Sequence, residues 1–113
     1  MPALSIETET KMTATIVRVA GRIDSDTAPE LDGILMKLLN SGSNKLVLNL
    51  QSVEFLSSAG LRAMVRALKE AQKSGGNIHL VSVSQPIEVI LRTVGMMQMF
   101  AIHANELEAA SSS

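Results

Sequence analysis

Runs typical of β-strands alternate with runs of helical periodicity along almost the whole of this 113-residue chain. The patterns predict strands over Leu4–Glu7, Thr13–Ala20, Lys45–Leu50, Asn77–Val83 and Met99–Ile102, with a hairpin turning near Thr10–Met12. A helical pattern separates each later pair of strands, so the inner strands are expected to run parallel. The predicted order is β-β-α-β-α-β-α-β-α, an α/β fold with a mixed sheet flanked by about four helices.

Four segments carry the apolar spacing of helices, and capping residues mark where each one begins. The first follows Asp24 and Asp26, acids that commonly serve as caps, and has Pro29 in its first turn. The others are expected to start at Ser57-Ser58, at Ser84–Pro86 and at Asn105, and glycines end the second and third. At this length we expect a single domain, residues 1–113, with residues 111–113 as a frayed tail.

The composition excludes several classes of function. A formal net charge of -1 and 2% aromatic residues offer neither a polyanion-binding surface nor stacking platforms, so no nucleic-acid partner is expected. No apolar run approaches the length of a membrane span, and the absence of cysteine is compatible with a reducing cytoplasm. We therefore expect a cytoplasmic protein without a membrane partner.

Residues suited to metal binding or catalysis are few. His79 and His103 lie on different predicted elements and are interpreted as surface or strand-end histidines, so no metal site and no cofactor are expected. Nucleotide-binding glycine motifs are absent, and no G-x-S-x-G elbow surrounds Ser57 or Ser58. The chain is therefore not expected to be an enzyme, although a small hydrolase using Ser58 is one alternative.

The pair Ser57-Ser58 stands between a buried strand and a helix, at the sheet edge where α/β proteins usually engage ligands and partners. One interpretation is that a serine simply caps the helix. The other is that an accessible hydroxyl at this edge has a function.

The sequence around this pair resembles the STAS domain family, in particular the stand-alone anti-sigma-factor antagonists of bacterial partner-switching systems. The resemblance rests on Leu46–Leu50 and Val53–Leu61, on Gly21–Asp24 with Thr27-Ala28, and on the Gly75-Gly76 turn. It covers essentially the whole chain. Many members have Asp where this chain has Ser57, and Ser or Thr where it has Ala59.

The resemblance implies a regulatory protein. Such proteins bind an anti-sigma factor that is also a serine kinase of the histidine-kinase-like ATPase type, are phosphorylated by it on the residue equivalent to Ser58, and are reset by a serine phosphatase. ATP and magnesium would belong to the kinase. Asp24 corresponds to an acidic residue that lies near the phosphorylated serine in the family.

A phosphate on Ser58 would lie at the positive end of a helix, so the fold should tolerate it and its effect should fall on a partner interface. Arg62, Arg66, Lys69 and Lys73 form one basic stripe on the same helix, which is either an ordinary solvated face or a docking surface for an acidic partner. The expected partner-binding residues are Asp24, Ser57, Ser58, Ala59, Gly60, Arg62 and Arg66. A STAS scaffold or ligand-sensing subunit that is never phosphorylated is the alternative function.

Overall fold

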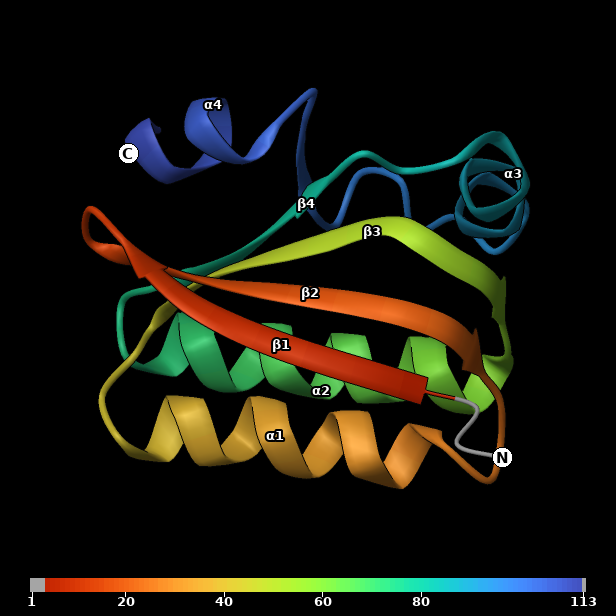
Figure 1. Ribbon diagram of the computed structural model, residues 1–113, viewed down its shortest axis with the longest axis horizontal. Coiled ribbons are helices and arrows are strands. Elements are labelled where there is room, and N and C mark those ends of the chain that lie inside the picture. Colours follow the sequence, from red (N-terminus) through yellow and green to blue (C-terminus); the bar gives the residue numbers. More distant parts are fainter. Residues whose placement is uncertain (1–3, 113) are drawn as a thin grey trace.

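The computed structural model describes residues 4–112, which form five strands and four helices in the predicted order (Figure 1). Their bounds are β1 Leu4–Lys11, β2 Ala14–Ile23, α1 Ala28–Asn40, β3 Lys45–Leu56, α2 Ser58–Lys73, β4 Asn77–Val81, α3 Gln85–Thr93, β5 Ala101–His103 and α4 Glu106–Ser111. The α/β fold with a mixed sheet is confirmed.

The strands form one sheet in the order β1-β2-β3-β4-β5. The hairpin pair β1 and β2 is antiparallel, and each later strand runs parallel to its neighbour, as the intervening helices require. Helices α1 and α2 lie side by side beneath one face of the sheet, and α4 lies on the opposite face (Figure 1). The buried residues of α3, Ile87 and Leu91, belong to the same core as those of α1 and α2.

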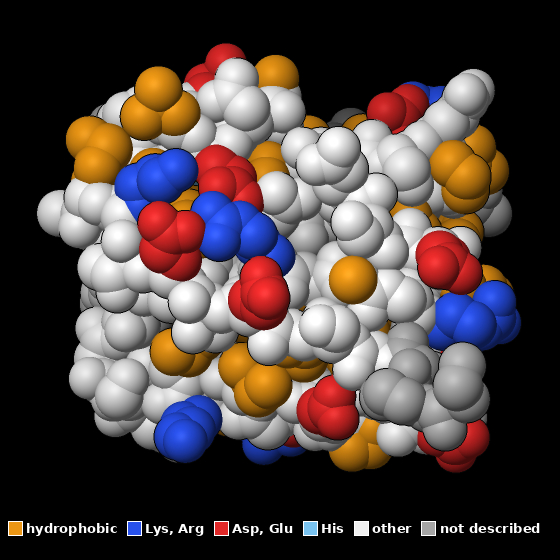
Figure 2. Space-filling view, in the orientation of Figure 1, with side chains coloured by type: hydrophobic (Ala, Val, Ile, Leu, Met, Phe, Trp, Pro, Cys, Tyr) orange, Lys and Arg blue, Asp and Glu red, His pale blue; other side chains and the backbone are white. Residues whose placement is uncertain are grey.

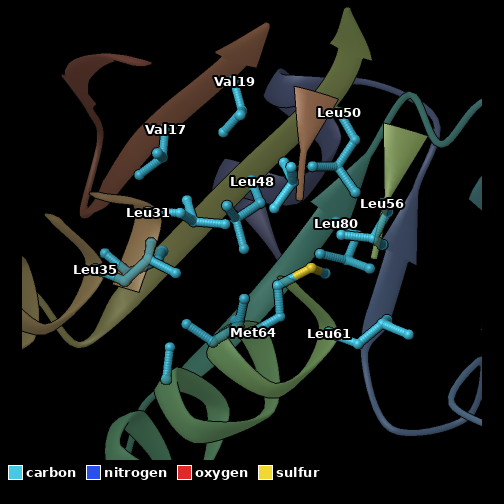
Figure 3. Close-up of a cluster of buried hydrophobic side chains, with 14 of the residues drawn as sticks. Val17, Val19, Leu31, Leu35, Leu48, Leu50, Leu56, Leu61, Met64 and Leu80 are labelled. Carbon is cyan, nitrogen blue, oxygen red and sulfur yellow. The ribbon is translucent and has the colours of Figure 1, made fainter. Parts of the chain in front are cut away.

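The main core fills the space between the sheet and the α1–α2 layer. Alternate residues of β2 and β3, such as Val17, Val19 and Leu48, point toward Leu31 of α1 and Met64 of α2 (Figure 3). Each of these side chains is almost completely removed from water. A smaller cluster on the opposite face lies under α4 and consists of Ala14, Ile16, Val47, Val81, Ala109 and Ala110. Burial on both faces explains why the centre of β3 is a continuous apolar run.

Several element boundaries differ from the sequence-based prediction. Strand β3 continues beyond Leu50 to Leu56, because its second half pairs with the end of β2 through two register shifts. Strand β1 extends to Lys11, and the hairpin turns at Met12, whose φ of 59° is left-handed. Strand β5 begins at Ala101 rather than Met99.

The C-terminal segment is more ordered than expected. Ser111 belongs to α4 instead of a frayed tail, since Ala109 and Ala110 are buried against the sheet. The ammonium group of Lys45 donates hydrogen bonds to the carbonyl oxygens of Ala110, at 2.9 Å, and Ser112, which holds the end of the helix. Residue 113 lies outside the described residues. Within residues 4–112, no helix has the length and apolar character needed to cross a membrane.

Candidate functional site

The Ser57-Ser58 pair lies where the carboxyl ends of β2 and β3 meet the first turns of α1 and α2, at the right-hand edge of the view in Figure 1. The amide of Ser57 donates a 2.8 Å hydrogen bond to the carbonyl oxygen of Ile23, the last residue of β2. This bond ties the turn before α2 to the turn before α1. Asp24 and the serine pair, far apart in sequence, therefore share one edge of the sheet.

The two serines have different structural roles. Ser57 is the N-cap of α2: its backbone is extended and its hydroxyl oxygen accepts a 3.2 Å hydrogen bond from the amide of Gly60. Ser58 is the first residue of the helix, is exposed, and its hydroxyl has no hydrogen-bond partner within residues 4–112. The cap is thus supplied by Ser57, and the Ser58 hydroxyl remains accessible.

Gly60 lies beneath the pair and brings α2 close to the sheet. A Cβ atom at this position would be 2.5 Å from Cγ2 of Ile23 and 2.7 Å from Cδ1 of Leu56, well inside van der Waals contact. Because Gly60 is buried, its contribution to the site is to set the position of the first turn of α2. The predicted role of Gly60 in partner binding would be indirect.

Asp24 shapes the turn before α1. Its Oδ1 accepts hydrogen bonds from the amides of Asp26 and Thr27, at 2.9 and 3.0 Å. The hydroxyl of Thr27 in turn donates a 2.7 Å bond to the carbonyl oxygen of Arg22. The amide of Thr27, above all, holds the pKa of Asp24 below its usual value. Asp24 is therefore an ionised residue of the turn next to the serine pair.

A groove of about 310 Å³ separates the first turns of α1 and α2 beside the serine pair. Ala59 and Ala63 contribute to its apolar lining, and Arg62 and Arg66 lie along its α2 side. Arg66 donates a 3.0 Å hydrogen bond to Asp32 of α1 across the groove. Ala59, Arg62 and Arg66 thus lie on the side of α2 that faces α1.

The predicted basic stripe of α2 is present, and it also lines a second groove, of about 590 Å³, whose apolar lining residues include Val65 and Met96. The four cations are not equally available. Arg66 is paired with Asp32, and Lys73 lies 3.7 Å from Glu70, whereas Arg62 and Lys69 have no ion pair within residues 4–112.

Sequence reasoning missed two side chains at this edge. The guanidinium of Arg22 lies over the ring of Phe55, 4.5 Å from its centroid, and the Phe55 side chain is 36% exposed. The two residues are direct partners in the parallel register of β2 and β3. Each stands one residue before a buried residue that ends its strand, a pattern that could have indicated their shared outward face.

The interpretation of His79 as a surface or strand-end residue is wrong. Its side chain is 3% exposed in β4, and its Nδ1 lies 3.0 Å from Nε2 of His103 on the neighbouring β5. Burial is the main cause that lowers the pKa of His79, and the charges of His103 and Lys45 act in the same direction. Among the described residues no three His, Cys, Asp or Glu side chains are grouped so that they could hold a metal ion.

A polar cavity of about 810 Å³ lies on the face of the sheet that carries α4, between β1, β2, β3 and the start of that helix. An ion-pair network forms its wall: Arg18 bonds to both carboxylate oxygens of Glu106, at 2.8 and 2.7 Å, and to Glu9 at 2.8 Å. Asn49 donates a further 2.7 Å bond to Glu106. Acidic and basic side chains accordingly gather on the molecular face that shows β1 (Figure 2).

The family model described as STAS domain matches residues 5–109. The curated anti-sigma-B factor antagonist of Staphylococcus aureus is 30% identical over 103 residues, which is 91% of this chain and 94% of that protein.

Solved structures share the fold. An anti-sigma factor antagonist from Mycobacterium paratuberculosis superposes with a TM-score of 0.85 at 24% identity, covering 96% of this chain and 93% of the other. The Bacillus cell fate determinant SpoIIAA in its phosphorylated form superposes with a TM-score of 0.73 at 17% identity, covering 93% and 96%.

Proposed function

This chain belongs to the STAS domain family, and on that premise we propose that it is an anti-sigma-factor antagonist whose partner binding is switched off by phosphorylation of Ser58. In the unmodified state it binds an anti-sigma factor that is also a serine kinase, and so frees whatever that factor restrains. A serine phosphatase resets the modified form. The name of the Staphylococcus aureus relative supports the anti-sigma factor as partner.

The accessible hydroxyl of Ser58 is the observation that carries this proposal. Because Ser57 supplies the cap of α2, a phosphate on Ser58 breaks no hydrogen bond of the described chain. The added charge of about -1.5 to -2 would lie near the free amides of the first helical turn, which favour an anion. Phosphorylation should therefore leave the fold intact and act on the interface.

Residues around Ser58 supply a surface suited to a protein partner. Asp24 contributes a negative charge, the guanidinium groups of Arg62 and Arg66 line the groove between α1 and α2, and exposed Phe55 adds an apolar contact. Burying a phosphate dianion against a fitted partner costs several kcal/mol, and about 3 kcal/mol already weakens binding roughly a hundredfold.

Phosphorylation is tested by incubating the chain with a candidate anti-sigma kinase, ATP and magnesium and measuring intact mass. We expect one phosphate per chain, none in Ser58→Ala, and normal modification in Ser57→Ala, which removes only the cap. The phosphorylated chain should bind the kinase about a hundredfold more weakly by calorimetry. Equal affinity of the two forms would refute the switch.

The basic stripe is tested by charge reversal. The double variant Arg62→Glu and Arg66→Glu should slow association with the partner, more strongly at low salt than at high salt. Lys37→Glu, which makes the same kind of change on the exposed side of α1, is the matched control. Association rates that are unchanged at low salt would make the stripe an ordinary solvated face.

The cavity of about 810 Å³ favours a second candidate, a STAS subunit that senses a small polar ligand and is never phosphorylated. In that case Ser58→Ala would leave all regulation of partner binding intact. The mass measurement and this variant together separate the two functions.

A further inference from the structure

Ser58 begins the exposed row of α2 that the basic stripe continues. At about 100° per residue, Arg62 lies about 40° around the helix axis from Ser58 and one turn along it. Residues at this i, i+4 spacing are neighbours on a helix surface. Helical side chains lean toward the N-terminus, so the long side chain of Arg62 can extend toward the turn that carries Ser58.

Arg62 is also the cation of this turn that no acid already holds. Arg66, one turn further on, is engaged by Asp32 at 3.0 Å. Arg62 has no acidic partner within residues 4–112 and lines both grooves of α2. Its guanidinium can therefore move to a new anion without breaking an ion pair.

Asp24 and Arg22, two other charged residues at this edge, are already engaged. The carboxylate of Asp24 accepts bonds from the turn before α1, and the guanidinium of Arg22 lies on the ring of Phe55. A phosphate on Ser58 could reach Arg22 only by giving up that stacking. Arg62 is the partner that requires the smallest rearrangement.

We propose that Arg62 is the internal partner of a phosphate on Ser58, so that phosphorylation withdraws Arg62 from the partner-binding surface as well as adding negative charge to it. This inference rests on the proposed function, since it concerns the phosphorylated form. The switch then acts twice on one surface: an anion is added, and the first cation of the basic stripe is neutralised. Partners that need Arg62 lose it when the phosphate arrives.

The test uses the full chain with phosphoserine placed at position 58 during translation, so that no kinase is required. Phosphorus NMR titration gives the second pKa of the phosphate, which is about 6 for free phosphoserine. A neighbouring guanidinium stabilises the dianion and lowers this pKa. Arg62→Gln should raise it by about half a unit, Arg62→Lys should keep most of the shift, and 1 M salt should remove it.

Arg66→Gln is the matched control, because it removes the same group one turn further along α2. It should leave the phosphate pKa unchanged. The proposal is overturned if Arg62→Gln has no effect, or if Arg22→Gln rather than Arg62→Gln raises the pKa. Failure of the kinase to modify Ser58 would instead refute the proposed function, and the titration would still show whether Arg62 pairs with a phosphate at position 58.

Discussion

Replacing Gly60 by alanine adds one methyl group at the point where α2 is closest to the sheet. That methyl carbon would be 2.5 Å from Cγ2 of Ile23 and 2.7 Å from Cδ1 of Leu56. Both neighbours are buried, Ile23 completely, and the branched Ile23 side chain has little rotamer freedom. The helix must therefore move away from the sheet or the core must repack.

Two opposing terms set the size of the effect. Overpacking of a filled core destabilises by about 1–3 kcal/mol, and contacts this short indicate the upper end. Alanine is favoured over glycine inside a helix by about 1 kcal/mol. The net expectation for Gly60→Ala is a loss of about 2 kcal/mol in the free energy of unfolding.

Gly33→Ala is the matched control, because Gly33 lies within α1 and nothing stands within 4 Å of the Cβ it would gain. The control should stabilise the protein by about 1 kcal/mol, so the two alanine variants should differ by about 3 kcal/mol. Urea unfolding followed by far-UV circular dichroism measures both, since the chain lacks Trp and Tyr.

A double variant separates packing from other causes. In an Ile23→Ala background the space beside position 60 is partly empty, so Gly60→Ala should cost much less there than in the wild type. If Gly60→Ala is as stable as Gly33→Ala, or if the two changes at positions 23 and 60 are additive, close packing of this turn does not position the serine pair.

Three further results are expected. Ser57→Ala should lower the free energy of unfolding by about 1 kcal/mol through loss of the cap, while Ser58→Ala should change it by less than about 0.5 kcal/mol; equal effects would contradict the assigned cap. The pKa of Glu106 is lowered from 4.5 to about 2, so its ionised carboxylate stabilises the folded chain above pH 4.5, and this stabilisation is lost as pH falls through 2. After allowance for solvent screening, Glu106→Gln should lower the free energy of unfolding by about 1–2 kcal/mol at pH 7. Unfolding measured across pH should show this difference shrinking in acid, and a constant difference would argue against the ion pair. The pKa of His79 is lowered below 6.5 in the folded chain, so unfolding should become easier as pH falls below 6.5, and His79→Leu should flatten this dependence; an unchanged slope would place the titrating group elsewhere.

Local sequence patterns were enough to predict the element order. Each helix has its own apolar periodicity and capping residues, and each strand pattern lies between such segments. These signals depend on residues that are close together in the sequence, so they can be recognised without knowledge of the rest of the fold. The parallel inner strands then follow from chain connectivity alone.

Boundaries and burial depended on contacts between distant residues. The second half of β3 reads as a polar connection, and it is a strand because the end of β2 pairs with it. His79 looks like an ordinary strand residue until β5 places His103 against it, 24 positions later. The pairing of Arg18 with Glu106 joins residues 88 positions apart and has no local signal.

For the site, the sequence by itself determined that two serines stand between a buried strand and the helix that follows it, at the carboxyl end of that strand. It could not decide between them, because either hydroxyl is chemically suited to cap a helix. Tertiary structure made the choice: the amide of Ser57 bonds to Ile23, which holds Ser57 in the extended conformation of a cap and leaves Ser58 as the first helical residue. The packing of α1 against α2 also pairs Arg66 with Asp32, whereas Arg62 has no ion pair within residues 4–112. The sequence could not show this, because ion pairs between helices depend on how the helices are placed.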